Sequence, residues 1–237
     1  MKKTRIDDEN TNELYTVLPT VKKDDMYRSK IDLHNVDCLP FMKQCKDKQF
    51  DLAIVDPPYG IGANKMTLGN GKTKIYRGEN DWDNEIPKKA YWDELFRISK
   101  NQIVWGGNYF TEFLPPTSAW VFWDKGTGDN DFADGELAWT SFNGALRKVK
   151  RSWVGANAKN GNKRIHPTEK PVELYQWLIN KYANKGDKII DTFLGSGSIA
   201  IACDALHYDL VGTELDKRYF REASERLDQH RRQQTLF

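Results

Sequence analysis

Short apolar runs alternate with helical segments along most of the chain, and this alternation restricts the fold more than any other feature. The turns between them are short, which is typical of a sheet covered by helices on both faces. The expected strands lie at residues 30–37, 50–55, 102–107, 119–125, 135–142, 187–191 and 208–215. The runs 119–125 and 135–142 are joined by a Gly/Asp loop and are expected to pair antiparallel. We therefore predict an α/β fold: a doubly wound, mostly parallel, seven-stranded sheet with one antiparallel strand pair.

Composition sets the broad class. The 237 residues are 39% hydrophobic and 30% charged, which allows one domain with a sizeable core. No run of 18 apolar residues occurs, so we expect no membrane span. The three cysteines form no CxxC pair and no signal-peptide pattern is visible, which predicts a reducing compartment such as the cytoplasm. The net charge of +2 neither favours nor excludes nucleic acid as a partner.

Three segments depart from the regular alternation. Residues 1–29 are polar and mixed in charge, and we expect an N-terminal arm there. Residues 60–85 are rich in glycine and lack periodicity, which predicts a long mobile loop. Residues 145–165 hold seven Lys or Arg and no acid. The main domain is therefore expected over residues 30–237, with the basic segment as a small insert.

A glycine-rich turn lies between an expected strand and helix, in the stretch DTFLGSGSIA. Gly195 and Gly197 flank Ser196 there, and glycine lets a ligand approach the backbone. About twenty residues later a strand ends on Glu214, whose carboxylate can accept two hydrogen bonds from a ribose. This pattern favours a half-site for an adenosine-bearing cofactor. A tight strand–helix turn without a ligand remains the alternative.

The stretch FDLAIVDPPYG ends a core strand on an acid, two prolines and an aromatic residue. Prolines donate no backbone N–H, so Pro57 and Pro58 end the sheet ladder and leave the Pro57 carbonyl as a free acceptor. Asp56 supplies a second acceptor and Tyr59 a flat ring. Two acceptors beside a ring suit the exocyclic amine of a base that has left the duplex stack. The alternative is a rigid turn in which Asp56 acts only as a cap.

The motifs DPPYG, HPTEKP (166–171) and DTFLGSGSIAIA together resemble those of the amino-group DNA methyltransferases that use S-adenosylmethionine. Their order, with DPPY before the glycine turn, is similar to that of the permuted β class, which includes many adenine-N6 enzymes. The resemblance covers about residues 30–228 and implies a Rossmann-like methyltransferase fold. It implies as catalytic element Asp56, Pro57, Pro58 and Tyr59, and as cofactor-binding residues Asp37, Thr168, Lys170, Asp191, Phe193, Gly195, Ser196, Gly197 and Glu214. Within these sets Asp37 would reach the cofactor's adenine edge, and Lys170 with Thr168 the methionine part.

The expected partner is double-stranded DNA. Trp139 lies where the family often places an aromatic that flanks the flipped base, although a core tryptophan is nearly as good an interpretation. Basic residues of the insert suit phosphate contacts, with a solvated face as the alternative: Arg147, Lys148, Lys150, Arg151, Lys159, Lys163 and Arg164. An insert of about 20 residues is short for target recognition in this family. It can therefore require help from loop 60–85 or from a partner subunit.

The leading hypothesis is methylation of adenine N6 in DNA, because relatives that act on cytosine N4 more often carry Ser in place of Asp56. N4-cytosine methylation stays open, as do an RNA-base or protein-amide methyltransferase and a non-catalytic DNA-binding relative. A Rossmann dehydrogenase would explain neither DPPY nor HPTEKP. The four histidines are scattered and pair with no cysteine at ligand spacing, so no metal site is expected. A homodimer is compatible with so small a subunit, and the recognition sequence, a companion nuclease and a prokaryotic or phage source stay undetermined.

Overall fold

The computed structural model describes residues 29–62, 67–68, 73–74, 83–126, 133–152, 165–166 and 168–234. The expected N-terminal arm lies outside the described residues except for Ser29, as does most of loop 60–85. The strands are β1 Ile31–His34, β2 Phe50–Val55, β3 Thr67–Leu68, β4 Thr73–Lys74, β5 Ser99–Trp105, β6 Val121–Asp124, β7 Gly135–Thr140, β8 Arg147–Lys150, β9 Lys188–Asp191 and β10 Asp209–Thr213. The helices are α1 Cys38–Gln44, α2 Lys89–Ile98, the 3-10 helix η3 Gly107–Tyr109, α3 Val172–Tyr182, α4 Ser198–Leu206 and α5 Lys217–Gln234.

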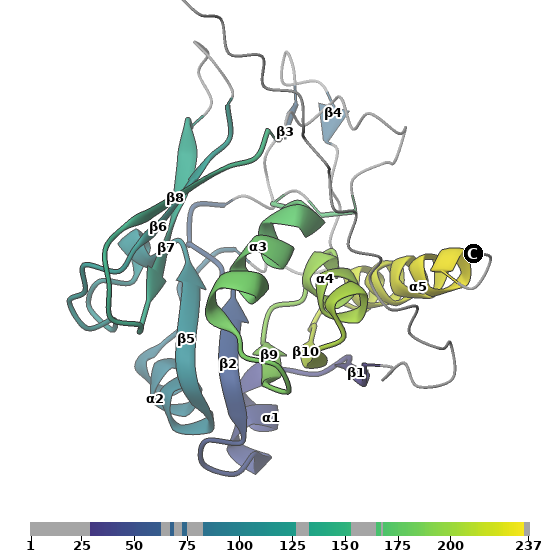
Figure 1. Cartoon of the computed structure of the whole chain (residues 1–237), viewed down its shortest axis with the longest axis horizontal. Coiled ribbons are helices and arrows are strands. Elements are labelled where there is room, and N and C mark those ends of the chain that lie inside the picture. The colour runs from purple at the N-terminus through teal and green to yellow at the C-terminus, as the bar shows by residue number, and fades with distance from the viewer. Residues whose placement is uncertain are drawn as a thin grey trace, which may run out of the picture.

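One mixed sheet carries the fold, with strand order β1-β10-β9-β2-β5-β7-β6-β8 (Figure 1). The pairs β1–β10, β10–β9, β9–β2 and β2–β5 are parallel, and β7 runs antiparallel to both β5 and β6. The α/β class and the antiparallel β6–β7 pair are thus confirmed. The predicted count of seven strands was wrong, because β8 joins the sheet as an eighth strand parallel to β6. A separate antiparallel pair, β3–β4, lies within the predicted loop 60–85.

The strand β8 lies inside the segment expected to be only a basic insert. Its sequence, Arg147-Lys148-Val149-Lys150, buries a single apolar side chain, Val149. An edge strand needs little apolar surface, and charged side chains on it discourage pairing with other molecules. The apolar pattern on which strand prediction depends is therefore almost absent from β8.

The two faces of the sheet are covered by different helices. Leu52 and Ile54 of β2 pack with α3, α4 and α5, whereas Ala53 and Val55 pack with α1 and α2 (Figure 1). This alternation follows from the two-residue period of a strand, which sends neighbouring side chains to opposite faces. A strand that is buried on both faces has a nearly continuous apolar sequence, as β2 does. The doubly wound arrangement predicted from the sequence is therefore present.

Local signals explain most helix boundaries. The apolar stripe of α2, Tyr91, Leu95 and Ile98, repeats at helical spacing and is fully buried, and Pro171 takes the N-cap position directly before α3. After β5 the chain forms η3 and turns up to residue 114, and Pro115 stops further winding. No helix in the described part of the chain combines the length and apolarity needed to cross a membrane.

Candidate functional site

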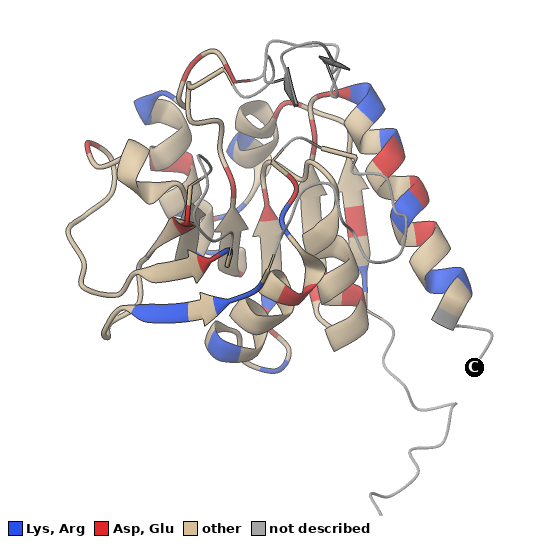
Figure 2. Ribbon diagram, turned by 90° about the horizontal axis from the view of Figure 1, so that it is seen from above, with Lys and Arg blue, Asp and Glu red and all other residues tan. Residues whose placement is uncertain are grey.

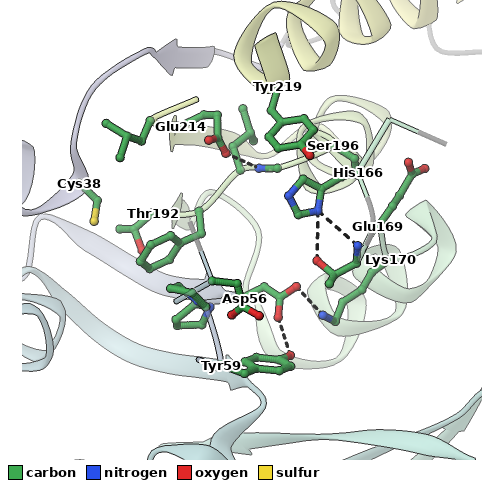
Figure 3. A pocket seen from close by; sticks show the side chains of 18 of the residues that line it. Cys38, Asp56, Tyr59, His166, Glu169, Lys170, Thr192, Ser196, Glu214 and Tyr219 are labelled. Carbon is green, nitrogen blue, oxygen red and sulfur yellow. Dashed lines mark hydrogen bonds and ion pairs between the residues drawn. The ribbon is translucent and has the colours of Figure 1, made fainter. Parts of the chain in front are cut away.

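A cavity opens where the sheet changes its winding direction. After β2 the chain continues through α2 to β5 on one side, and after β9 it continues through α4 to β10 on the other. A crevice forms at the carboxyl ends of the strands at such a switch point. The described residues that line this cavity are Val36, Asp37, Cys38, Asp56, Pro57, Pro58, Tyr59, Asp83, His166, Thr168, Glu169, Lys170, Tyr175, Thr192, Phe193, Leu194, Gly195, Ser196, Glu214, Leu215 and Tyr219 (Figure 3).

Asp56 follows directly after β2, and its carboxylate is engaged on both oxygens. The Tyr59 hydroxyl donates to Oδ1 over 2.7 Å, and Lys170 Nζ donates to Oδ2 over 2.5 Å (Figure 3). Burial raises the pKa of Asp56, and the Lys170 ammonium offsets part of this rise. The lysine was expected to reach a cofactor, but in the structure its ammonium is bound to the aspartate 114 residues earlier in the chain.

Lys170 also meets a second acid that the sequence analysis did not single out. Its Nζ lies 3.2 Å from Oε2 of Glu136, at the start of β7, and its side chain is only 1% exposed. Burial disfavours the ammonium, yet Asp56 and Glu136 outweigh this, so the pKa of Lys170 lies above its ordinary value. Glu136 is further paired with Lys125, 2.6 Å from its Oε1. Despite burial, these two lysines hold the pKa of Glu136 below its ordinary value.

The ring of Tyr59 is held by its neighbours. Tyr109 stacks on it with 4.8 Å between ring centroids and an interplanar angle of 14°, and Phe110 meets it edge-on. Gly106 lies so close that a Cβ there would be 2.2 Å from Cε1 of Tyr59. Tyr109 is 44% exposed, and its aromatic character at the end of η3 was the only sequence signal for this contact. These neighbours fix the plane of the Tyr59 ring beside Asp56.

The glycine turn forms the opposite wall of the cavity. Gly195 and Gly197 both have positive φ, +52° and +72°, and Gly197 serves as N-cap of α4. A Cβ at Gly197 would lie 2.9 Å from that of Ala223, so this glycine also lets α5 pack closely. The Gly195 N–H donates to Oε2 of Glu214 over 2.9 Å, which places the carboxylate against the turn. Burial raises the pKa of Glu214.

Asp191 ends β9 beneath this wall and does not line the cavity. It is buried, and its Oδ1 accepts the Phe193 N–H over 2.9 Å. Burial raises its pKa to about 8, and the nearby Asp56 and Glu214 add to the rise. The carboxyl group is therefore protonated at neutral pH.

The HPTEKP motif closes one side of the cavity. Nδ1 of His166 lies 3.1 Å from Oγ1 of Thr168, and burial together with Lys170 lowers the pKa of His166 to about 3. Glu169 forms an ion pair with Arg226 of α5 over 3.3 Å, and Arg226 also donates to the Ser196 carbonyl over 3.0 Å. Arg226 therefore joins this motif to the glycine turn. Pro167 lies outside the described residues.

Two exposed apolar side chains stand at the rim of the cavity. Val36 follows β1 and Leu215 follows Glu214, and they are 40% and 58% exposed. Asp37 lines the same cavity and caps α1 by accepting the Leu39 N–H over 2.9 Å. Sequence reasoning identified Asp37 and Glu214 but missed these apolar neighbours, whose only signal was their place directly beside the two acids.

Comparison with known proteins shows which family the chain resembles. A sequence profile of the N6/N4 methyltransferase family, described as DNA methylase, matches residues 138–225. This span includes the HPTEKP motif and the glycine turn, and the DPPY element lies upstream of it. Over this span the chain is similar to the N6/N4 DNA methylases. Two of the three motifs that suggested the family from sequence are thus inside the matched span.

Individual proteins show the same likeness to the chain. It is 25% identical to the type II methyltransferase M.HpaI of Haemophilus parainfluenzae, over 79% of this chain and 71% of that protein. Among solved structures it is similar to the M1.HpyAVI–SAM complex, with TM-score 0.53, 20% identity, and coverage of 84% of this chain and 99% of the other. It is also similar to the cytosine-N4-specific PvuII DNA methyltransferase, with TM-score 0.53, 13% identity, and coverage of 86% and 92%. The structural likenesses show the shared fold.

The predicted DNA-binding residues of the chain fall into three groups. Trp139 is buried in β7, its indole N–H donates to the Pro115 carbonyl over 2.8 Å, and it does not line the cavity around Asp56, so the structure favours the core alternative. Strand β8 carries the exposed basic side chains Arg147, Lys148 and Lys150, with Arg151 directly after it (Figure 2). Lys148 is paired with Asp124 over 2.8 Å. The predicted residues Lys159, Lys163 and Arg164 lie outside the described residues.

No group of three or more His, Cys, Asp or Glu side chains within the described ranges is arranged to hold a metal ion.

Proposed function

We propose that the protein is a DNA methylase, which transfers a methyl group from S-adenosylmethionine to the N6 amine of an adenine that has been flipped out of duplex DNA. One observation carries the proposal. A single cavity at the switch point of the sheet is lined both by Asp56, Pro57, Pro58 and Tyr59 and by the glycine turn with Glu214. An acceptor pair for an amine and a half-site for an adenosine group are therefore within one enclosed space.

The residues of the second half fit S-adenosylmethionine. Each oxygen of Glu214 accepts one backbone N–H, from Gly195 and Asp216, and a carboxylate oxygen retains capacity for a ribose hydroxyl. The exposed side chains of Val36 and Leu215 offer apolar contact to a flat base beside Asp37. Thr168, Phe193 and Ser196 line the remaining path toward Asp56. When bound, S-adenosylmethionine supplies an electrophilic methyl group.

The residues of the first half act on the target amine by orientation. In the proposed complex the Asp56 carboxylate and the Pro57 carbonyl accept the two amino hydrogens. This directs the nitrogen lone pair out of conjugation with the ring, and Tyr59 fixes the ring plane by stacking. As the nitrogen gains positive charge, the adjacent carboxylate stabilises it electrostatically in a site that excludes water. We assign no strong general base, because the amine loses its proton only after charge has developed on it; that proton then passes to the Asp56 carboxylate and on to water.

Adenine is the proposed base because Asp56 stands where relatives that act on cytosine more often carry Ser. Cytosine N4 is the second candidate, since the matched family includes both amines and a cytosine-N4-specific enzyme shares the fold. Methylation of RNA or of a protein amide is a weaker candidate, because such relatives usually carry Asn in place of Asp56. A relative that only binds DNA would have no need for the engaged Asp56–Tyr59 pair.

For the DNA contact we propose the exposed basic side chains of β8 and the basic residues that follow them, up to 165. The charges of Arg147, Lys148 and Lys150 lie along β8, the outer strand of the sheet (Figure 2), where a phosphate backbone can approach. Because this basic segment is short, we propose that a second subunit or loop 60–85 also contributes to target recognition. We expect the protein to act in the cytoplasm of a bacterium or of a phage-infected cell.

The test uses tritiated S-adenosylmethionine, the purified protein and unmethylated genomic DNA, with RNA and protein extract as parallel substrates. The labelled DNA is digested to nucleosides, which are separated. Label in N6-methyl-2′-deoxyadenosine is the expected result. Label in N4-methylcytosine would keep the mechanism and change the base, whereas absence of label from DNA would refute the proposal.

A further inference from the structure

Glu136 is an acid at the site for which neither the motifs nor the proposed reaction supplies a role. It is the second residue of β7 and lies opposite Trp123 of β6. Its Oε2 is buried and points at Lys170 over 3.2 Å, and its Oε1 meets Lys125 over 2.6 Å. Two lysines thus hold one carboxylate at the edge of the cavity.

These contacts form a chain of alternating charge: Lys125, Glu136, Lys170 and Asp56. Lys170 lies in the middle of its two acids and 5.2 Å from the ring centroid of Trp105, with its side chain 1% exposed. A buried ammonium without a partner is strongly destabilising. Lys170 must therefore stay bound to a carboxylate, and the structure provides two.

This arrangement bears on how Asp56 becomes available. Both of its oxygens already accept hydrogen bonds, from Tyr59 and from Lys170. An amine that enters the site competes for the same acceptor, and the shorter of the two contacts made by Lys170 is the one to Asp56. If Lys170 turned toward Glu136, Oδ2 would be released while the ammonium kept a partner.

We propose that Glu136 is a positioning residue: it holds Lys170 beside Asp56 and takes over the ammonium when the target amine binds. The inference rests on the proposed function, since it assigns Asp56 to the amine. Glu136 itself touches neither substrate nor cofactor in this account. Its effect reaches the reaction through Lys170.

The test compares Glu136→Gln with Glu94→Gln. Glu94 is a matched control, because it is also partly buried and paired with a basic residue, Arg97, over 2.6 Å, but lies in α2 away from the cavity. With Glu136→Gln, Lys170 has only Asp56 as a carboxylate partner, and the ammonium stays on Oδ2. We expect kcat to fall about 10- to 100-fold, the factor that corresponds to one charged hydrogen bond, while the KM for DNA and the Kd for S-adenosylmethionine stay within about twofold.

The pH profile separates positioning from a merely structural role. The titratable groups that act on Asp56 are Lys170, Glu136, Tyr59, Asp191 and Tyr175. Removing the negative charge of Glu136 makes ionisation of Asp56 easier, so the acid limb of kcat moves to lower pH in Glu136→Gln. Glu136→Asp keeps the charge and should recover part of kcat with the acid limb of the wild type. A kcat and a pH profile equal to those of Glu94→Gln would overturn the inference.

A measurement without turnover distinguishes this inference from the proposed function. Carbon-13 carboxyl resonances of labelled aspartates are titrated in the free protein, and the Asp56 resonance is assigned by its loss in Asp56→Asn. The Asp56 titration should move to lower pH in Glu136→Gln and stay in place in Glu94→Gln. If the Asp56 resonance titrates at the same pH in Glu136→Gln as in the wild type, the positioning role is refuted, even if the protein methylates DNA. Absence of methyl transfer by the wild type refutes only the proposed function.

Discussion

Replacing Asp56 by Ala tests the assignment on which the other roles depend. The substitution removes the acceptor for the Tyr59 hydroxyl and for Lys170 Nζ at the same time. If the carboxylate stabilises charge on the amine, the loss resembles the removal of one preorganised electrostatic group. We therefore expect kcat to fall by a factor of about 10² to 10³. Cofactor affinity should change little, because Glu214 and the glycine turn form the opposite wall of the cavity.

The same change has a cost in stability that can be worked from the contacts. Lys170 loses one charged hydrogen bond, which contributes about 1.5–3 kcal/mol, and keeps Glu136 as its partner. The free energy of unfolding should fall by about 2 kcal/mol, which for a chain of this size lowers Tm by about 4–8 °C. The double variant Asp56→Ala/Lys170→Met also removes the ammonium that has lost its shorter contact. It should regain most of the unfolding free energy while activity stays low.

Two assays read these quantities. Transfer of tritium from S-adenosylmethionine to DNA measures kcat, and urea unfolding followed by tryptophan fluorescence measures stability. If Asp56→Ala methylates DNA within about tenfold of the wild-type rate, well short of the loss that one preorganised group produces, the carboxylate does not act on the amine and the proposed mechanism is wrong. A double variant that recovers activity together with stability would show that Asp56 serves only to neutralise Lys170.

Three further perturbations test other parts of the reasoning. Between its ordinary pKa of 3.8 and its folded value of about 8, Asp191 keeps a proton that the unfolded chain has released. As the pH rises through that window, the unfolding free energy of the wild type should therefore fall, relative to that of Asp191→Asn, by up to about 1.4 kcal/mol per pH unit. If urea unfolding from pH 5 to 8 gives the two proteins parallel profiles of unfolding free energy against pH, the raised pKa is contradicted. Gly106→Ala adds a Cβ 2.2 Å from the Tyr59 ring at a residue with φ +65°. It should lower kcat, while the cofactor affinity measured by calorimetry stays unchanged. An unchanged kcat would show that the plane of the Tyr59 ring does not matter. Changing Lys150 and Arg151 to Gln should reduce the slope of log K for DNA against log salt by about 2, and an identical slope would show that both are merely solvated.

The sequence predicted the parts of the fold that local pattern determines. The runs that became β2 and β9 are apolar because both faces of the sheet are covered, and the stripe of α2 repeats at helical spacing, so each could be recognised alone. Strand β8 was missed because three of its four residues are Lys or Arg on an outer edge. Its place in the sheet depends on pairing with β6, and such pairing leaves no apolar signature.

The site was predicted as a set of motifs, but the contacts among its members were not. Asp56 and Lys170 belong to motifs 114 residues apart, and only the sheet brings them together. Glu136 and Tyr109 belong to no motif. Glu136 lies in an ordinary strand run and Tyr109 at the end of η3. Apart from the aromatic character of Tyr109, nothing in the sequence indicated a buried ion pair or a ring stacked on Tyr59. Spacing along the chain can suggest which residues carry chemistry, whereas partners on other strands require the fold.

The order of motifs along the chain matters less than the order of strands in the sheet. β2 and β9 are far apart in sequence but are parallel neighbours, so Asp56 and Asp191 emerge at the same edge of the sheet. Two buried acids this close cannot both ionise easily, and their partners differ. Asp56 binds the ammonium of Lys170 and accepts the Tyr59 hydroxyl, whereas Asp191 accepts the Phe193 N–H, has no cationic partner among the described residues, and keeps its proton at neutral pH. Lys170 thereby favours a negative charge on Asp56, on the side of the cavity where the amine is proposed to bind.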